Sequence, residues 1–134
     1  MREKILIERA KKARERAYAP YSKFKVGAAL LTKRGKVYTG ANVENATFGL
    51  TVCAERVAIF KAVTNGEKNF VKIAVVADKD EPATPCGACR QVLSEFASDV
   101  KIICANLKGK TKRYNLRGLL PEAFEKFKKN PSTD

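Results

Sequence analysis

The chain contains no histidine in its 134 residues, and this absence narrows the chemistry that its side chains can perform. Neither a Ser-His-Asp triad nor a Cys-His nucleophile pair can be assembled within it. Long apolar runs are also missing, since no stretch of about 18 apolar residues, the length of a membrane-spanning helix, occurs. The first residues, Met1–Lys4, lead into a charged helical pattern rather than the apolar core of a signal peptide. We therefore expect a cytoplasmic protein without a membrane segment.

Acidic residues are scarce relative to basic ones, because 14 Asp and Glu against 27 Lys and Arg give a net charge of +13. Such a charge attracts polyanions and raises the hypothesis of a nucleic-acid partner. The basic residues are spread along the chain, from Lys11 and Lys12 to Lys126–Lys129, and they form no compact stripe with aromatic residues. We therefore predict a solvated basic surface and expect no nucleic-acid partner.

Cysteine occurs only four times, which does not suit a disulfide-dense scaffold. In a chain without export signals, reduced thiols or metal binding are favoured over two disulfides. Cys104 stands apart from the other three cysteines, in the apolar run Val100–Ala105. We predict that it is a small buried thiol on a strand.

The length fits one domain, residues 1–134, with one core. Apolar periodicity and turn residues predict the order of the elements. The first half contains a helix over Arg2–Tyr18 ended by Ala19-Pro20, a hairpin of Val26–Thr32 and Lys36–Ala41, a loop over Asn42–Thr51 and a helix over Cys53–Val63. The second half contains a strand over Val71–Ala77, a loop over Lys79–Pro85 and a helix over Cys86–Ala97. Strands over Val100–Ala105 and Thr111–Tyr114 and a final helix beginning at Pro121 follow. The alternation of strands and helices after residue 50 indicates an α/β fold with a mixed sheet.

Three cysteines and one glutamate, Cys53, Glu55, Cys86 and Cys89, form the most informative pattern in the chain. Three thiolates can hold Zn²⁺ and leave its fourth tetrahedral position to water, whereas a structural zinc site usually closes all four positions with protein atoms. Both cysteine segments fall where a loop is expected to become a helix, and the positive end of a helix lowers thiol pKa values and offsets thiolate charge. Glu55 is close enough in sequence to Cys53 to reach a metal-bound water as a general acid and base.

A site of three thiolates and Zn²⁺ carries a net charge of about minus one, which makes its water harder to ionise. Arg56 and Arg90 directly follow site residues, and we expect them to donate hydrogen bonds to the sulfurs. Two alternatives stay open. A redox dithiol at Cys86 and Cys89 leaves Cys53 and Glu55 unexplained, and a structural zinc site needs a fourth ligand, such as Cys104 or a carboxylate.

Several sequence motifs, among them the two that contain the cysteines, are spread over nearly the whole chain and follow one another in the order typical of one protein family. They are Ala19–Leu30 (APYSKFKVGAAL), Asn42–Ala46 (NVENA), Thr51–Arg56 (TVCAER), Pro85–Val92 (PCGACRQV) and Leu119–Phe124 (LLPEAF). With these stretches the chain resembles the cytidine deaminase family, in its short homotetrameric branch with three cysteine ligands. The resemblance implies a three-layer α/β/α fold with a central mixed sheet of about five strands.

The resemblance also implies roles for individual residues. Cys53, Cys86 and Cys89 would hold one Zn²⁺ per subunit, and Glu55 would shuttle protons while a zinc-bound hydroxide attacks C4 of cytosine. In the substrate pocket, Phe24 would stack on the pyrimidine, Asn42 and Glu44 would hydrogen-bond the ribose hydroxyl, and main-chain groups near Ala54 and Cys86 would meet the base edge. Neighbouring subunits of a homotetramer would complete each pocket with Phe124 and the loop of Phe48. Many family members carry tyrosine where this chain has Phe48, so we expect a shape contact only.

The predicted function is therefore the hydrolytic deamination of cytidine and deoxycytidine to uridine and deoxyuridine, with release of ammonia, in pyrimidine salvage. Two related activities remain as alternatives, namely deamination of another aminopyrimidine such as blasticidin S and deamination of cytosine in nucleic acid. A noncatalytic, zinc-stabilised binding module is a third, and it predicts a closed metal site without a hydrolytic water.

Overall fold

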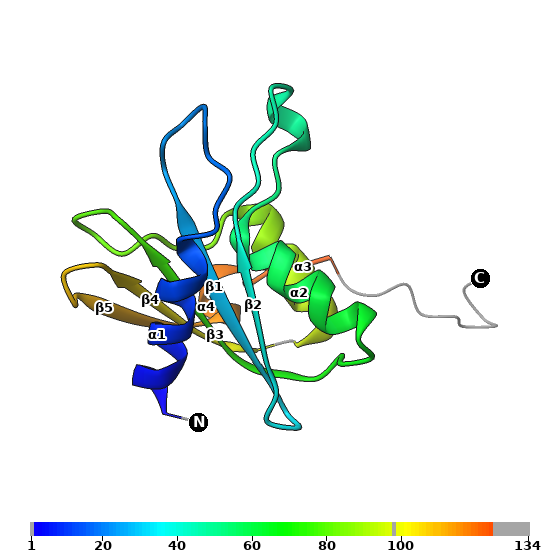
Figure 1. Ribbon diagram of the computed structural model, residues 1–134. Helices are drawn as coiled ribbons and strands as arrows, with labels where there is room; N and C mark the ends of the chain where they lie inside the picture. Colours follow the sequence, from blue (N-terminus) through cyan, green and yellow to red (C-terminus); the bar gives the residue numbers. More distant parts are fainter. Residues whose placement is uncertain (1, 98, 125–134) are drawn as a thin grey trace.

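A five-stranded mixed sheet forms the centre of the computed structural model, which describes residues 2–97 and 99–124 (Figure 1). Its strands are β1 (Val26–Thr32), β2 (Val37–Ala41), β3 (Phe70–Ala77), β4 (Lys101–Asn106) and β5 (Thr111–Asn115). They lie in the order β2-β1-β3-β4-β5; β3 and β4 are parallel, and the other neighbouring pairs are antiparallel. The predicted hairpin and the mixed sheet are confirmed.

Helices cover both faces of the sheet (Figure 1). The helices are α1 (Glu3–Arg14), α2 (Ala54–Thr64), α3 (Gly87–Phe96) and the short α4 (Leu116–Leu119), with a 3₁₀ turn, η1, over Phe48–Leu50. One face is covered by α1, which packs on β1 and β3, whereas α2 packs on β1 and β2 of the other face beside α3. This arrangement confirms the three-layer α/β/α fold.

The two cores follow from the alternation of side chains along the strands. In β1, Ala28 and Leu30 belong to the cluster under α2 and α3, while Ala29 and Leu31 belong to the cluster under α1. Successive residues of a strand point to opposite faces, so a strand with helices on both sides must be apolar at every position. The unbroken apolar sequence of β1 therefore reflects its place between two helical layers.

Two glycines in the first hairpin allow helices to approach the sheet closely. A Cβ at Gly27 would lie 2.0 Å from the carbonyl oxygen of Ala10 in α1. On the opposite face, a Cβ at Gly40 would lie 2.5 Å from the carbonyl oxygen of Ala54, the first residue of α2. The first turn of α2, where the predicted proton shuttle lies, is thus seated directly on β2.

The first helix is shorter than predicted, because α1 ends at Arg14 rather than at Tyr18. The main chain of Tyr18 instead pairs with the loop after β2: its N–H donates to Asn42 O at 2.9 Å, and its carbonyl accepts from Glu44 N at 2.9 Å. Helical hydrogen bonding would consume the same groups. The pairing ties the residues before β1 to the loop after β2, and both loops rise from the same end of the sheet (Figure 1).

The predicted helix beginning at Pro121 is not found in residues 121–124, which form a turn and an irregular segment; the rest of that prediction lies outside the described residues. Two reasons are visible. Leu116 is buried in the core and begins α4, which uses the preceding residues for a helical turn. The N–H of Phe124 donates to the side chain of Gln91 at 3.1 Å rather than to a helical carbonyl. Among the described residues, no helix has the length and apolar character needed to cross a bilayer.

Candidate metal centre and adjoining pocket

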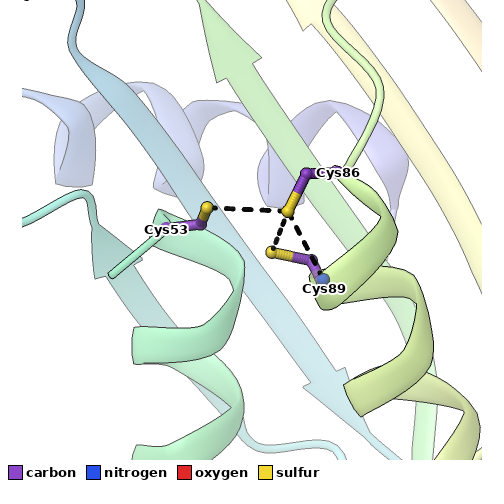
Figure 2. Close-up of side chains that lie close together, drawn as sticks. All are labelled: Cys53, Cys86 and Cys89. Carbon is purple, nitrogen blue, oxygen red and sulfur yellow. Dashed lines mark hydrogen bonds between the residues drawn. The ribbon is translucent and has the colours of Figure 1, made fainter. Parts of the chain in front are cut away.

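Two helices begin at the candidate metal centre, and each begins at a cysteine. Cys53 is the N-cap residue of α2 and Cys86 is the N-cap residue of α3, both with extended backbone angles, and Cys89 lies in the first turn of α3. Figure 2 shows the three sulfurs pointing toward one another from these two helix starts. The sequence prediction that both segments stand at helix amino termini is confirmed.

The spacing of the three sulfurs fits a tetrahedral zinc ion. The Sγ atoms of Cys53 and Cys86 are 3.7 Å apart, those of Cys86 and Cys89 are 3.3 Å apart, and all three lie within 4.8 Å of one another. Zn–S bonds of about 2.3 Å in tetrahedral geometry place two sulfurs about 3.8 Å apart. Three converging thiols are therefore positioned to hold one metal ion, as predicted.

Without a cation the three thiols cannot all lose their protons. The pKa of Cys53 is lowered by hydrogen bonding with Cys89 and by the guanidinium of Arg56, whereas the pKa of Cys89 is raised by its proton-donating contact with Cys53 and by burial. Loss of the proton from one thiol thus raises the pKa of the other, because like charges at this separation repel. A divalent cation removes that conflict, and this is the chemistry of a thiolate metal site.

Arg56 lies against the sulfurs, in agreement with the expectation for it. Its Nη2 donates to Cys53 Sγ at 3.4 Å, and its pKa is raised by that contact. Its Nε is buried and has no hydrogen-bond partner among the described residues. The half-buried guanidinium therefore supplies positive charge where thiolate charge would gather.

Arg90 does not make the predicted contact with the sulfurs. Its guanidinium donates to the carbonyl oxygens of Pro85 at 2.8 Å and Leu119 at 3.0 Å, and to Thr84 Oγ1 at 3.2 Å. These three hydrogen bonds hold the loop before Cys86 and the end of α4.

Glu55 is a buried carboxylate in the first turn of α2, with 4% of its surface exposed. Burial raises the pKa of Glu55 to about 7, and the negative charge of Cys53 adds to the rise. A carboxyl group with a pKa near neutrality can both accept and release a proton at physiological pH. Glu55 is therefore suited to proton transfer at the position that the sequence pattern assigned to it.

A cavity of about 220 Å³ opens beside the cysteines and contains most of the predicted pocket residues. Its lining comprises Ser22, Phe24, Val26, Asn42, Glu44, Thr51, Cys53, Ala54, Glu55, Val75, Ala83, Thr84 and Cys86. Phe24, Asn42, Glu44 and Ala54 are the substrate contacts that the sequence predicts within this chain. These residues come from loops and helix starts far apart in the sequence, and all four line one cavity.

Phe48 and Phe124 are the two predicted pocket residues that do not line the cavity of their own chain. Phe48 lies in η1 with 79% of its surface exposed, and Phe124 follows α4 with 86% exposed. Cys104 is also separate from the metal centre, on β4, where it is fully buried as predicted.

Sequence reasoning missed three polar residues of the cavity, namely Ser22, Thr51 and Thr84. Ser22 donates to the carboxylate of Glu44 and accepts from Phe24 N at 3.0 Å. Thr84 Oγ1 accepts from Arg90. In a sequence, Ser and Thr in a loop cannot be told from ordinary turn residues. The one signal for a role was their position directly before or between residues of the motifs.

The amino-acid sequence matches the family model described as the cytidine and deoxycytidylate deaminase zinc-binding region over residues 1–106. A cytidine deaminase of Halalkalibacterium halodurans is 54% identical over 92% of this chain and 95% of its own length. A crystal structure of cytidine deaminase from Burkholderia pseudomallei superposes with a TM-score of 0.90 at 50% identity, covering 92% of this chain and all of that one. A blasticidin-S deaminase of Bacillus cereus is a more distant relative, 35% identical over 75% of this chain and 76% of its own.

Proposed function

Because this chain belongs to the cytidine and deoxycytidylate deaminase family, we propose that it is a zinc-dependent hydrolase that converts cytidine and deoxycytidine to uridine and deoxyuridine with release of ammonia. One observation carries the proposal most directly. Three converging thiols and a buried carboxyl group of raised pKa adjoin a single cavity, which is lined by an aromatic ring and hydrogen-bonding side chains. Such an activity belongs to pyrimidine salvage.

The residues around the cavity divide the work of hydrolysis. Cys53, Cys86 and Cys89 would hold Zn²⁺, which would supply a Lewis acid that lowers the pKa of water. Glu55 accepts a proton from water, delivers one to N3 of the cytosine ring, and passes one to the exocyclic amine so that ammonia departs. Arg56 keeps the charge of the thiolates from suppressing this ionisation. The overall change adds water at C4 and removes ammonia.

Substrate binding is assigned to other lining residues of the same cavity. Phe24 offers a flat apolar face for the pyrimidine ring, and main-chain groups near Ala54 offer hydrogen bonds to the base edge. Asn42 and Glu44 offer an amide and a carboxylate to the sugar hydroxyls. Glu44 keeps its charge for this purpose, because hydrogen bonds from the Ser22 hydroxyl and main chain hold its pKa below the ordinary range.

A homotetramer in which neighbours complete each pocket is part of the proposal. Phe48 and Phe124 expose most of their surface, and aromatic residues are enriched at protein–protein interfaces relative to the rest of the surface. Gln91 holds the main chain of Phe124 at two points, with bonds of 3.0 and 3.1 Å. The mass of the protein in solution, measured by light scattering, tests the assembly; a monomer with full activity would contradict it.

We assign the enzyme to the cytoplasm. All four cysteines are free thiols, and the proposed metal ligands need to stay reduced. A reducing compartment preserves them.

The decisive experiment combines metal content with turnover. Glu55→Ala should retain about one zinc per chain while losing nearly all cytidine deamination, because the ligands remain and the proton carrier is gone. Glu95→Gln, an exposed change on α3, serves as the matched control and should behave like the wild type. Zinc is measured by atomic emission and turnover by the absorbance change of cytidine. Substantial activity in Glu55→Ala would remove the role assigned to Glu55.

A substrate panel separates this function from the related ones. Cytidine, deoxycytidine, blasticidin S and a cytosine-containing oligonucleotide are compared with ammonia release as the common readout. We expect turnover of the two free nucleosides. If only blasticidin S or only the oligonucleotide is deaminated at physiological salt, the enzyme acts on another substrate class and the proposed function is wrong.

A further inference from the structure

The loop that carries Phe24 is held in an unusual backbone conformation. It joins α1 to β1, and Lys23, immediately before Phe24, has a φ of +61°. Non-glycine residues seldom adopt the left-handed region, and they keep it only when surrounding contacts enforce it. The contacts around Lys23 therefore determine where the Phe24 ring is presented.

Three of these contacts converge on one carboxylate. Glu44 Oε1 accepts from the main-chain N–H groups of Tyr21 and Ser22, both at 3.1 Å, and Glu44 Oε2 accepts from the Ser22 hydroxyl. The side chain of Glu44 is buried, with 7% exposed. A carboxylate offers about four acceptor positions, so roughly one remains free for a substrate hydroxyl.

The Ser22 hydroxyl makes one hydrogen bond as a donor and another as an acceptor. It donates to Glu44 Oε2, and its oxygen accepts from the N–H of Phe24 at 3.0 Å. On the other side of Phe24, Asn42 Nδ2 donates to the Phe24 carbonyl at 2.9 Å, and Asn42 Oδ1 accepts from Val26 N at 2.8 Å. Both main-chain polar groups of Phe24 are thus bonded to side chains of the proposed pocket.

We propose that Ser22 is a positioning residue for substrate binding, whose hydroxyl joins the Glu44 carboxylate to the main chain of Phe24. This inference rests on the proposed function, because it concerns how the base-stacking ring and the sugar-binding carboxylate are held relative to each other. With the hydroxyl in place, the ring and the carboxylate form one preorganised unit. Without it, the Phe24 N–H and Glu44 Oε2 both lose a partner, and the loop at Lys23 loses one of its restraints.

The zinc thiols and Glu55 make no hydrogen bond to the Ser22 hydroxyl, whose bonds in the described structure go to Glu44 and Phe24. The chemical step should therefore be affected far less than binding. A residue that acts on binding raises KM with little change in kcat, when KM reports substrate affinity. This split is the signature that a general loss of stability would not produce.

The test compares Ser22→Ala and Ser22→Thr, with Ser94→Ala as the matched control. Ser94 donates to the Gln91 carbonyl within α3, so the control removes a serine hydroxyl bond outside the cavity. Ser22→Ala should raise KM for cytidine about tenfold, the loss expected for one hydrogen bond to a charged group, and change kcat by less than about twofold. Ser22→Thr keeps the hydroxyl and should stay within about threefold of the wild type. Ser94→Ala should match the wild type.

Amide hydrogen exchange at Phe24, followed by NMR, supplies a readout that does not depend on activity. Exchange should accelerate in Ser22→Ala and remain slow in Ser22→Thr, with zinc content unchanged in both. An unaltered KM and unaltered exchange in Ser22→Ala would overturn the proposal, as would equal losses in the alanine and threonine variants. If the wild type fails to deaminate cytidine, the proposed function falls; the exchange data then decide separately whether Ser22 holds Phe24.

Discussion

The four cysteines occupy two different environments, and burial alone does not separate them. Cys89 and Cys104 are both fully buried, but only Cys89 belongs to the cluster of converging sulfurs. Burial raises the pKa of Cys104 to about 12, and the negative charge of Glu55 adds to the rise. Cys104 therefore remains a neutral thiol, and a neutral thiol is a poor metal ligand.

We expect Cys104→Ala to keep about one zinc per chain and to lower the free energy of unfolding by about 1 kcal/mol, the cost of a small cavity in a strand core. Cys86→Ala, by contrast, removes a ligand and should lose the metal. Zinc content and thermal unfolding of the two variants give the comparison. Equal loss of zinc in both would place Cys104 at the metal, as a structural site with four ligands requires.

The cysteine pattern was predictable because ligand spacing and helix starts are local properties of a sequence. The direction in which a side chain points, by contrast, depends on hydrogen-bond partners from other parts of the chain. Arg56 and Arg90 each directly follow a site residue, yet only Arg56 reaches a sulfur, since Arg90 is drawn to three acceptors in the preceding loop and at Leu119. Ser22 was overlooked for the same reason: its two partners are fixed by a loop conformation that its own residue type does not reveal.

At the scale of elements, α3 does more than present two thiols. Gln91, two residues after Cys89, pairs its side-chain amide with both main-chain polar groups of Phe124. The helix that begins at the metal centre therefore also fixes the segment that carries an exposed aromatic side chain. Two separate features of the proposed tetrameric pocket are attached to one rigid element.

We expect Gln91→Leu, which keeps the shape and removes both hydrogen bonds, to accelerate amide exchange at Phe124 and to raise KM for cytidine severalfold. In a Phe124→Ala background the same change should have no further effect on KM, because residues that act through one another are not additive. Steady-state kinetics of the four proteins complete this cycle. Additive effects of the two substitutions would show that Gln91 acts elsewhere.

The loop before α3 is fastened to the β4–β5 hairpin. Asn106 Nδ2 donates to the Asp80 carbonyl at 2.8 Å, and Glu81 accepts from Lys110 at 2.5 Å and from Lys112 at 3.0 Å. Hydrogen bonds from the two lysines, that from Lys110 being the stronger, lower the pKa of Glu81 to about 2. This loop contributes lining residues to the cavity, so the hairpin supports the pocket from outside.

The ion pairs of Glu81 give a pH dependence of known sign. A carboxyl whose pKa is lower in the folded protein contributes stability above its unfolded value of 4.5, and the contribution fades as pH falls toward 2. The wild type should therefore unfold at a slightly higher temperature than Glu81→Gln at pH 7, with the difference shrinking below about pH 4.5. Added salt should also reduce it, because the pair is exposed. A difference that grows on acidification would contradict this origin.

Strands were predicted more accurately than helix ends. An apolar run such as β1 has one physical meaning when helices cover both faces, and its predicted bounds were those observed. The ends of α1 and the segment after Pro121 depend on competition for main-chain groups by Asn42, Glu44 and Gln91, which come from distant parts of the chain. Such tertiary competition cannot be read from local periodicity.

At the scale of the whole molecule, the layers are set by the closeness of helix and sheet. Gly40→Ala would place a methyl group 2.5 Å from Ala54 O and 2.6 Å from Ala58 N, both backbone atoms of α2. Because neither can move without shifting the helix, we expect a loss of about 3 kcal/mol in the free energy of unfolding, with reduced turnover from displacement of Glu55. Gly118→Ala is the control and should not destabilise the protein, because no described atom beyond its own helical turn lies within 4 Å of the new Cβ. Chemical denaturation measures both; equal stability of Gly40→Ala and the wild type would refute the packing argument.

The outer strand β5 has a consequence for the behaviour of concentrated solutions. Among residues 2–97 and 99–124 its only partner strand is β4, and it exposes Lys112 and Arg113 along its length. An unpaired strand edge invites the same edge of another molecule, and cationic side chains along it make that approach unfavourable. This edge of the sheet is thereby disfavoured as a place where sheets of two molecules could join and extend into fibrillar aggregates.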